Sequence, residues 1–177
     1  MEQEDLEKVL GKEENVEEET PVGGTILDVL KEKRERISED DTVKMDVPGY
    51  GGFLVVEYKL LPYELVSKLV NKAAKAKNPL HELAAQTDIV VQSCVGFYVR
   101  PDEGEELQPL NTADPSFGND PVLYDQRLVT AAGLTGNLDS ARKVAQALFN
   151  NDVALVSHSN ELIQWMRDTE KESDQGF

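Results

Sequence analysis

The stretch that most constrains the fold runs from Thr42 to Lys77, where a hairpin pattern leads directly into a helix pattern. Residues 42–47 alternate polar and apolar side chains, which predicts a half-buried strand. One proline and three glycines in residues 48–52 then predict a reversal, because proline fixes φ and glycine tolerates positive φ. Residues 53–60 are rich in aromatic and β-branched side chains, so they predict the second strand of a hairpin.

The helix expected after this hairpin begins near Pro62, whose missing N–H would be unpaired at a helix start anyway. Leu65, Val66, Leu69 and Val70 recur at helical spacing, which predicts a helix over residues 63–75. No side chain of the hairpin or of this helix forms a recognisable reactive group.

Four further helices are predicted after residue 78. Asn78 and Pro79 mark a break. The apolar run from Leu80 to Tyr98 favours one buried helix over a strand at residues 89–91, because the run is continuous and carries Ala84 and Ala85 in its first part. Residues 100–121 hold four prolines and predict a long irregular loop, with a short hairpin from Phe97 to Leu110. The remaining helices are expected at 122–132, at 140–149 with Asn137 or Asp139 as its cap, and at 153–169.

These patterns predict an α+β fold that is mostly α-helical, in which a β-hairpin at residues 42–60 is followed by a bundle of about five helices. At 177 residues the chain is long enough for one domain and too short for two comfortable ones. We expect a disordered acidic arm over residues 1–24, a single domain over 25–169 and a flexible tail over 170–177. The domain would open with a weakly docked helix from Thr25 to Ile37.

The chain is strongly acidic, with 34 acidic and 18 basic residues and a formal net charge of −16. Nine acidic residues and two lysines lie within residues 1–20. We expect this segment to be disordered, because it has too few apolar side chains to form a core. An overall negative charge argues against a nucleic-acid partner, because phosphates require a basic surface.

Cys94 is the single cysteine, so an internal disulfide is excluded, and its apolar neighbours indicate a core position in a reducing compartment. No basic segment followed by an apolar run opens the chain, and no apolar run approaches the ~20 residues of a membrane helix. We therefore expect a soluble intracellular protein with no signal peptide and no membrane partner.

Three candidate reaction centres are weaker than their structural alternatives. His158 and Glu161 have the i, i+3 spacing found in metal-binding bundles, but a site needs three or four ligands. Cys94 with a histidine lacks a nucleophile signature, and its valine neighbours would raise the thiol pKa. The loop at residues 48–52 lacks the Lys-Ser/Thr ending of a phosphate-binding loop. We expect no catalytic residue, no metal and no cofactor, hence a protein that is not an enzyme.

The predicted binding residues are Tyr50, Leu162, Trp165 and Met166. Tyr50 lies at the tip of the predicted turn, and the other three fall along one stripe of the last helix. The alternative is that Trp165 and Met166 pack on the helix at residues 80–98. We expect part of the stripe, above all Trp165, to stay accessible to a partner. If Trp165 is core, the binding surface is expected at the Tyr50 turn or in the 100–121 loop.

The run from Val47 to Tyr58 resembles the VPGYGG-x-L-x-V-x-Y opening of tail-assembly chaperones from long-tailed, siphovirus-type phages that infect actinobacteria. Further similar pieces follow in the same order, and the resemblance covers about residues 42–167. These pieces are Lys75–Pro79, Glu82-Leu83, Ala85–Cys94, Leu107–Asn111, Tyr124-Asp125, Leu148–Asp152 and His158–Met166.

The resemblance implies a non-enzymatic protein of the infected host's cytoplasm that holds the tape-measure protein while tail tube subunits polymerise, and that is absent from the finished virion. The tail tube protein and further copies of the chain are additional candidate partners. Many small helical domains would cover the apolar stripes of such a client, and the negative charge would keep the assembly soluble. The alternative is a structural virion component, either a head–tail completion protein or a minor tail protein.

Overall fold

The computed structural model describes residues 25–29, 41–102 and 104–175. The chain divides into two units, Met1–Lys33 and Arg34–Phe177. In the first unit residues 26–29 are helical, and Thr25 caps them through its Oγ1, which accepts from the Asp28 amide at 3.2 Å. The acidic arm and most of the helix predicted from Thr25 to Ile37 lie outside the described residues.

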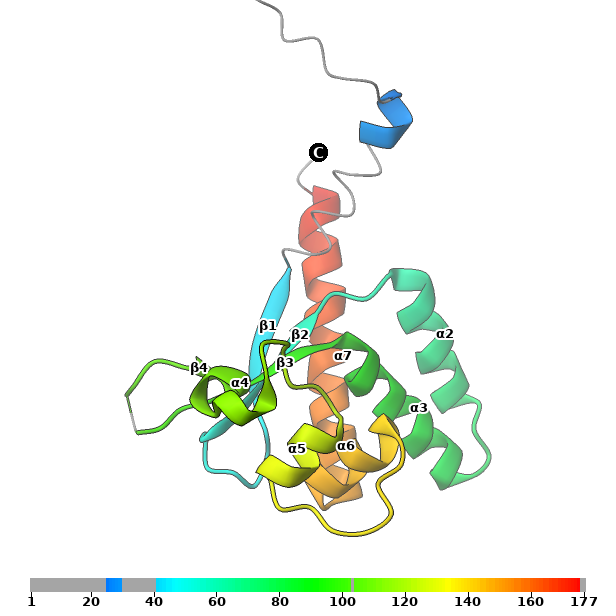
Figure 1. Ribbon diagram of the computed structural model, residues 1–177. Helices are drawn as coiled ribbons and strands as arrows, with labels where there is room; N and C mark the ends of the chain where they lie inside the picture. The colour runs from blue at the N-terminus through cyan, green and yellow to red at the C-terminus, as the bar shows by residue number, and fades with distance from the viewer. Residues whose placement is uncertain (1–24, 30–40, 103, 176–177) are drawn as a thin grey trace, which may run out of the picture. The chain divides into compact units, whose positions relative to one another are not determined.

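The described part of the second unit contains one antiparallel sheet with the strand order β1-β2-β3-β4. The predicted hairpin is confirmed as β1 (Thr42–Asp46) and β2 (Leu54–Lys59), in register from Thr42 opposite Lys59 to Asp46 opposite Val55. The sheet continues with β3 (Cys94–Val99) and the short β4 (Gln108–Pro109), which lies at the left-hand edge of Figure 1.

The turn between β1 and β2 needs its glycines. Gly49, Gly51 and Gly52 have φ values of +89°, +59° and +79°, a region that side chains with a Cβ rarely adopt. A Cβ on Gly52 would also lie 3.3 Å from the Arg100 guanidinium, which donates to the Gly52 carbonyl. The Tyr50 hydroxyl donates to the Leu148 carbonyl at 3.3 Å, so the tip of the turn is anchored on a later helix.

The two helices that follow are α2 (Tyr63–Ala74) and α3 (Pro79–Ser93). Pro62 stands before the first residue of α2 as expected, and the Asn78 side chain caps α3 by accepting from the Leu80 amide at 2.9 Å. The predicted helix from Leu80 to Tyr98 is wrong from Cys94 onward, because Cys94–Val99 forms β3 and pairs with β2. An apolar run of this kind suits a buried helix and a central strand equally, and the neighbouring strand decides between them.

The segment after β3 contains the short hairpin predicted from Phe97 to Leu110, seen as the pairing of β3 with β4. It continues through α4 (Leu110–Ala113) and a 3₁₀ turn at Pro115–Phe117. The helix predicted at 122–132 is shorter, since α5 spans only Gln126–Ala131. Val122 instead lies beside β3 and accepts from the Phe97 amide at 3.1 Å, while Asp125 caps α5.

Arg127 organises the loop before α5. Its guanidinium donates to the carbonyls of Phe117, Asp120 and Pro121 at 3.2, 3.0 and 2.8 Å and pairs with the Asp125 carboxylate at 2.6 Å. One charged side chain therefore provides hydrogen-bond donors to three carbonyl groups of this loop, which no helix or strand ladder would otherwise pair.

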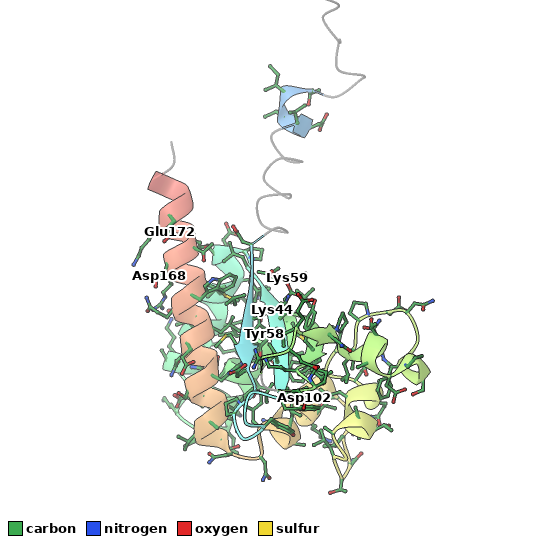
Figure 2. All side chains as sticks on the ribbon, turned by 90° about the vertical axis from the view of Figure 1, so that its left-hand side faces the viewer. Lys44, Tyr58, Lys59, Asp102, Asp168 and Glu172 are labelled. Carbon is green, nitrogen blue, oxygen red and sulfur yellow. The ribbon has the colours of Figure 1, made fainter. Side chains whose placement is uncertain are left out.

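The last two helices are α6 (Ala141–Phe149) and α7 (Asp152–Gln175). Ser140 caps α6, in place of the predicted Asn137 or Asp139, because its Oγ accepts from the Lys143 amide. The left-handed Asn150 ends α6, and α7 continues to Gln175 rather than ending at Thr169. Asp168 and Glu172 point outward from the distal part of α7 (Figure 2).

The core joins the apolar face of the sheet to α3, which packs against α2, α6 and α7. Tyr58, Phe97, Ile89 and Leu155 are among its fully buried side chains. The α+β class is confirmed, but the predicted hairpin with a five-helix bundle is incomplete, because a third and a fourth strand extend the sheet. Two polar contacts join α3 to its neighbours. Ser159 donates to the Gln86 side chain at 2.6 Å, and Arg142 forms a bidentate pair with Asp88 through its Nε and Nη2.

Candidate functional site

The predicted binding stripe on α7 divides between core and surface. Leu162 is 0% exposed, so its prediction as a contact residue for a partner is corrected: it is a core residue. Met166 is 1% exposed and also belongs to the core, but one side of it lines the groove described next. Trp165 is half-buried and packs against the core from outside. Adjacent side chains on a helix are rotated by about 100°, so a stripe read from spacing includes both buried and boundary positions.

A groove runs between α2 and the distal part of α7, and we call it the helix groove. It has a volume of about 120 Å³. Its α2 side presents residues at spacings i, i+3, i+4, i+7 and i+8, and its α7 side adds three more. The lining residues are Tyr63, Val66, Ser67, Val70, Asn71, Met166, Arg167 and Glu170.

The helix groove combines an apolar floor with an exposed aromatic rim. Val66 and Met166 are 6% and 1% exposed and form the floor, whereas Tyr63 is 65% exposed. Tyr63 was not among the predicted site residues. The sequence does carry a signal for it, because Tyr63, Val66 and Val70 recur at helical spacing and so share one apolar face of α2.

Trp165 does not line the helix groove. Arg167 lies about 100° from Met166 on one side of the helix and Trp165 about 100° on the other. Because Arg167 lines the groove, Trp165 faces away from it, on the opposite boundary of α7's buried face. Its carbonyl accepts from the Thr169 hydroxyl at 2.9 Å.

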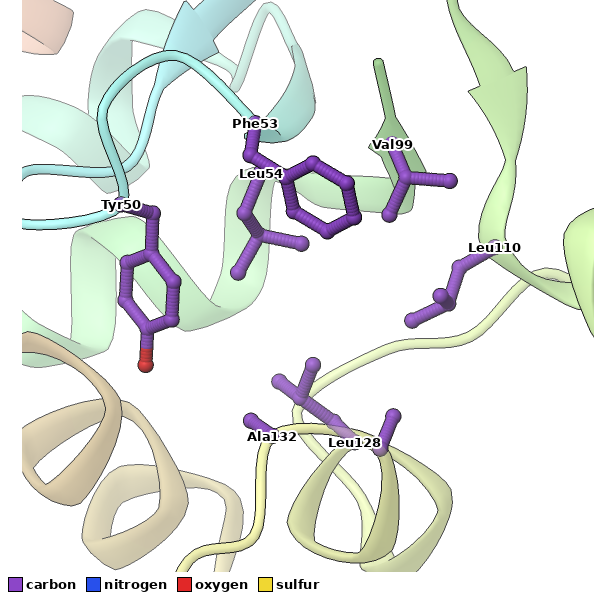
Figure 3. A pocket seen from close by; sticks show the side chains of 8 residues that line it. Tyr50, Phe53, Leu54, Val99, Leu110, Leu128 and Ala132 are labelled. Atoms are coloured by element: carbon purple, nitrogen blue, oxygen red, sulfur yellow. The ribbon is translucent and has the colours of Figure 1, made fainter. Parts of the chain in front are cut away.

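Tyr50 contributes to a second hollow, which we call the turn pocket (Figure 3). Figure 3 shows Tyr50, Phe53 and Leu54 on the turn side, Leu110 reaching in from the right, and Leu128 and Ala132 closing the lower side. The pocket has a volume of about 80 Å³, and Val99 and Ala131 complete its lining. Its floor residues are buried, while Phe53 is 50% exposed. This pocket lies where two predicted alternatives meet, the Tyr50 turn and the 100–121 loop.

His158 occupies the interior of the fold. It is 3% exposed, and its Nε2 lies 2.8 Å from the Tyr58 hydroxyl, which lies 3.1 Å from the Tyr124 hydroxyl. Burial lowers the pKa of His158 to about 4 and raises the pKa of both tyrosines well above 10. The three side chains are therefore neutral near pH 7 and satisfy one another in the core.

His158 and Glu161 are not arranged to bind a metal ion together, because Nε2 of the buried histidine is hydrogen-bonded with Tyr58, whereas Glu161 is exposed. Within residues 25–29, 41–102 and 104–175, no group of three or more His, Cys, Asp or Glu side chains is placed to hold a metal ion.

Cys94 begins β3 and packs against the core. Burial is the main cause that raises the pKa of its thiol to about 12, and the nearby Asp125 and Glu57 carboxylates add to the increase. A thiol with such a pKa stays protonated near pH 7, and the thiolate is the nucleophilic form.

No helix in the described part of the chain is long and apolar enough to cross a bilayer. Comparison with models of known protein families, with curated proteins and with solved structures finds no match to this chain.

Proposed function

We propose that this protein is a non-enzymatic tail-assembly chaperone of a long-tailed phage, which binds the tape-measure protein in the host cytoplasm and keeps it soluble while the tail tube polymerises. The client is suggested by the resemblance of residues 42–167 to that family. The observation that carries a binding role is the helix groove, whose floor is apolar and whose rim carries Tyr63, a side chain that is 65% exposed.

A groove between two helices suits an extended helical client. Amphipathic helices bind by placing apolar side chains at helical spacing into a hydrophobic groove. The α2 side offers Val66 and Val70 one turn apart, and Tyr63 adds an aromatic contact at low cost in side-chain entropy. Arg167 at the rim provides a polar contact that can orient the client.

The experiment that tests the proposal is co-expression with the tape-measure protein of the same phage, scored for a soluble complex in a pull-down. Tyr63→Glu places a charge at the groove and should remove most of the client from the pull-down, with little loss of thermal stability because Tyr63 is exposed. Val153→Glu is the matched control, because Val153 is 77% exposed at the start of α7, away from the groove lining. A client that remains insoluble with the unmodified protein, or a complex indifferent to Tyr63→Glu, contradicts the proposal.

A structural virion component is the second candidate, and purified virions separate the two. A chaperone should be missing from virions in which the tail tube protein is readily detected by mass spectrometry. Recovery of this chain at a fixed ratio to the tail tube protein would favour the structural role.

A further inference from the structure

The chain segment that supplies Leu110 to the turn pocket is acidic. Residues 101–120, which follow Val99 and include Leu110, contain six acidic residues and no lysine or arginine. Their described members Asp102, Glu105, Glu106, Asp114 and Asp120 are all exposed. In Figure 2 Asp102 lies beyond the lower end of the sheet, away from the end that carries Lys59. Of the nearby cations, Arg100 binds the Gly52 carbonyl and Arg127 pairs with Asp125.

A surface of opposite charge lies at the connection between α2 and α3. Lys72, Lys75 and Lys77 are exposed, and none has an ion-pair partner among the described residues. Leu80 follows them at the start of α3 and is 69% exposed, held in place by the Asn78 cap. We call Lys72, Lys75, Lys77 and Leu80 the lysine corner. It presents one aliphatic side chain flanked by cations on a chain whose net charge is −16.

We propose that the turn pocket of one copy of this protein binds the lysine corner of a second copy, with Leu80 in the pocket and the lysines against the acidic residues of segment 101–120. The pocket's volume of about 80 Å³ suits one aliphatic side chain. It is well below the ~300 Å³ or more of a typical small-molecule site. The lysine corner is complementary to the pocket in two ways: Leu80 is an apolar side chain for the apolar lining, and the lysines are cations for the acidic segment.

The two surfaces lie on different sides of the molecule, because α2 is at the right-hand edge of Figure 1 and β4 with α4 at the left-hand edge. One copy can therefore offer its lysine corner to a second copy while its own pocket receives a third. Such a heterologous contact repeats head to tail and forms an open chain, or a ring if the rotation closes. Charge pairs at the rim contribute mainly specificity and association rate, so the contact should weaken as salt screens them.

The test uses sedimentation velocity of the purified full-length protein from about 1 µM to about 1 mM, the range of weak association. The average mass of the unmodified protein should rise with concentration at low salt and fall when salt is added. Leu80→Glu removes the apolar contact and adds a repelling charge, in a helix first turn where an acid is favourable. Ala131→Arg fills the pocket mouth from an exposed position of α5. Each variant should weaken self-association by about tenfold or more.

Mixing the two variants distinguishes a head-to-tail contact from a symmetric one. The Leu80→Glu protein keeps an intact pocket and the Ala131→Arg protein keeps an intact corner, so the mixture should form a one-to-one complex that neither variant forms alone. Val153→Glu is the control for loss of an exposed apolar side chain and should associate like the unmodified protein. If Leu80→Glu has an altered thermal melt, the Lys75→Glu, Lys77→Glu double variant replaces it as the corner variant, and if Ala131→Arg has one, Ala131→Glu replaces it as the pocket variant.

Three results would overturn the inference: an unmodified protein that stays monomeric over this range at low salt, a Leu80→Glu protein that associates normally, or a variant mixture that fails to associate when the unmodified protein does. All three are obtained without the tape-measure protein, so the outcome is independent of the proposed function.

Discussion

Acidification should destabilise this protein through His158. The imidazole is 3% exposed, and burial lowers its pKa from 6.5 to about 4. As pH falls below 6.5 the unfolded chain binds a proton at this position, whereas the native chain stays neutral until about pH 4. The free energy of unfolding therefore falls as pH decreases through this window, and the full stability is present only above pH 6.5.

The size of the effect follows from the two pKa values. One pKa unit corresponds to about 1.4 kcal/mol, so the separation between 6.5 and about 4 amounts to about 3 kcal/mol when the window is crossed completely. Between pH 7.5 and pH 5 the expected loss is about 2 kcal/mol. That is a substantial share of the ~5–15 kcal/mol that stabilises a typical domain.

The measurement is urea denaturation at pH 7.5, 6 and 5, carried out on the unmodified protein and on His158→Gln. Glutamine keeps an acceptor for the Tyr58 hydroxyl but does not titrate, while the carboxylates titrate in both proteins and cancel in the comparison. The stability difference between the two proteins should shift by about 2 kcal/mol in favour of His158→Gln from pH 7.5 to pH 5.

This reasoning would be refuted if the difference in unfolding free energy between the unmodified protein and His158→Gln stayed constant with pH. An NMR titration in which the His158 imidazole of the folded protein changes charge near pH 6.5 would refute it as well. Either result would mean that the histidine is solvated in the native state and that its contacts with Tyr58 and Phe149 are open to water.

Three further perturbations have defined outcomes. Arg127→Ala should lower the free energy of unfolding by about 1–3 kcal/mol and speed hydrogen exchange in residues 117–121, because it removes a charged donor to three carbonyls; unchanged exchange would contradict this role. Trp165→Ala should cost less than the ~3–5 kcal/mol of a fully buried tryptophan because the side chain is half-buried, and it should leave tape-measure binding largely unchanged because Trp165 faces away from the helix groove; loss of binding at native stability would place the client on the Trp165 side of α7, and a thermal-unfolding loss of the full amount would identify Trp165 as core. Cys94→Ala should retain client binding in a pull-down if it folds, and loss of binding at native stability would indicate a chemical role for the thiol.

Local chemistry explains which elements the sequence predicted well. The β1–β2 hairpin follows from alternation on both sides of a proline–glycine turn, and the positive φ angles occur at its glycines. Pro62 and Asn78 mark the starts of α2 and α3 because a missing N–H and a capping side chain act within a few residues. The short β3–β4 hairpin was also predictable from turn residues and sequence proximity.

Elements that depend on distant partners were not predictable in this way. Cys94–Val99 becomes β3 because the edge of β2 satisfies its backbone groups, and nothing within the segment itself separates this outcome from a continued helix. Residues 121–125 are held beside β3 by the Phe97 amide and by Arg127, so α5 starts late. The three-residue chain of Tyr58, Tyr124 and His158 joins positions 66 and 100 residues apart.

The candidate binding surfaces show the same division. Sequence spacing placed Leu162, Trp165 and Met166 on one stripe, but only the packing of α7 against α3 decided that Leu162 and Met166 are core and that Trp165 lies at the boundary. The helix groove needs α2 and α7 together, and the turn pocket needs side chains from the turn, β3, α4 and α5. The sequence by itself determined the local turns, the helix starts and the acidic balance, because these depend on neighbouring residues and on composition. Only the tertiary structure decided which apolar side chains remain for a partner, because that depends on which of them the rest of the fold has already buried.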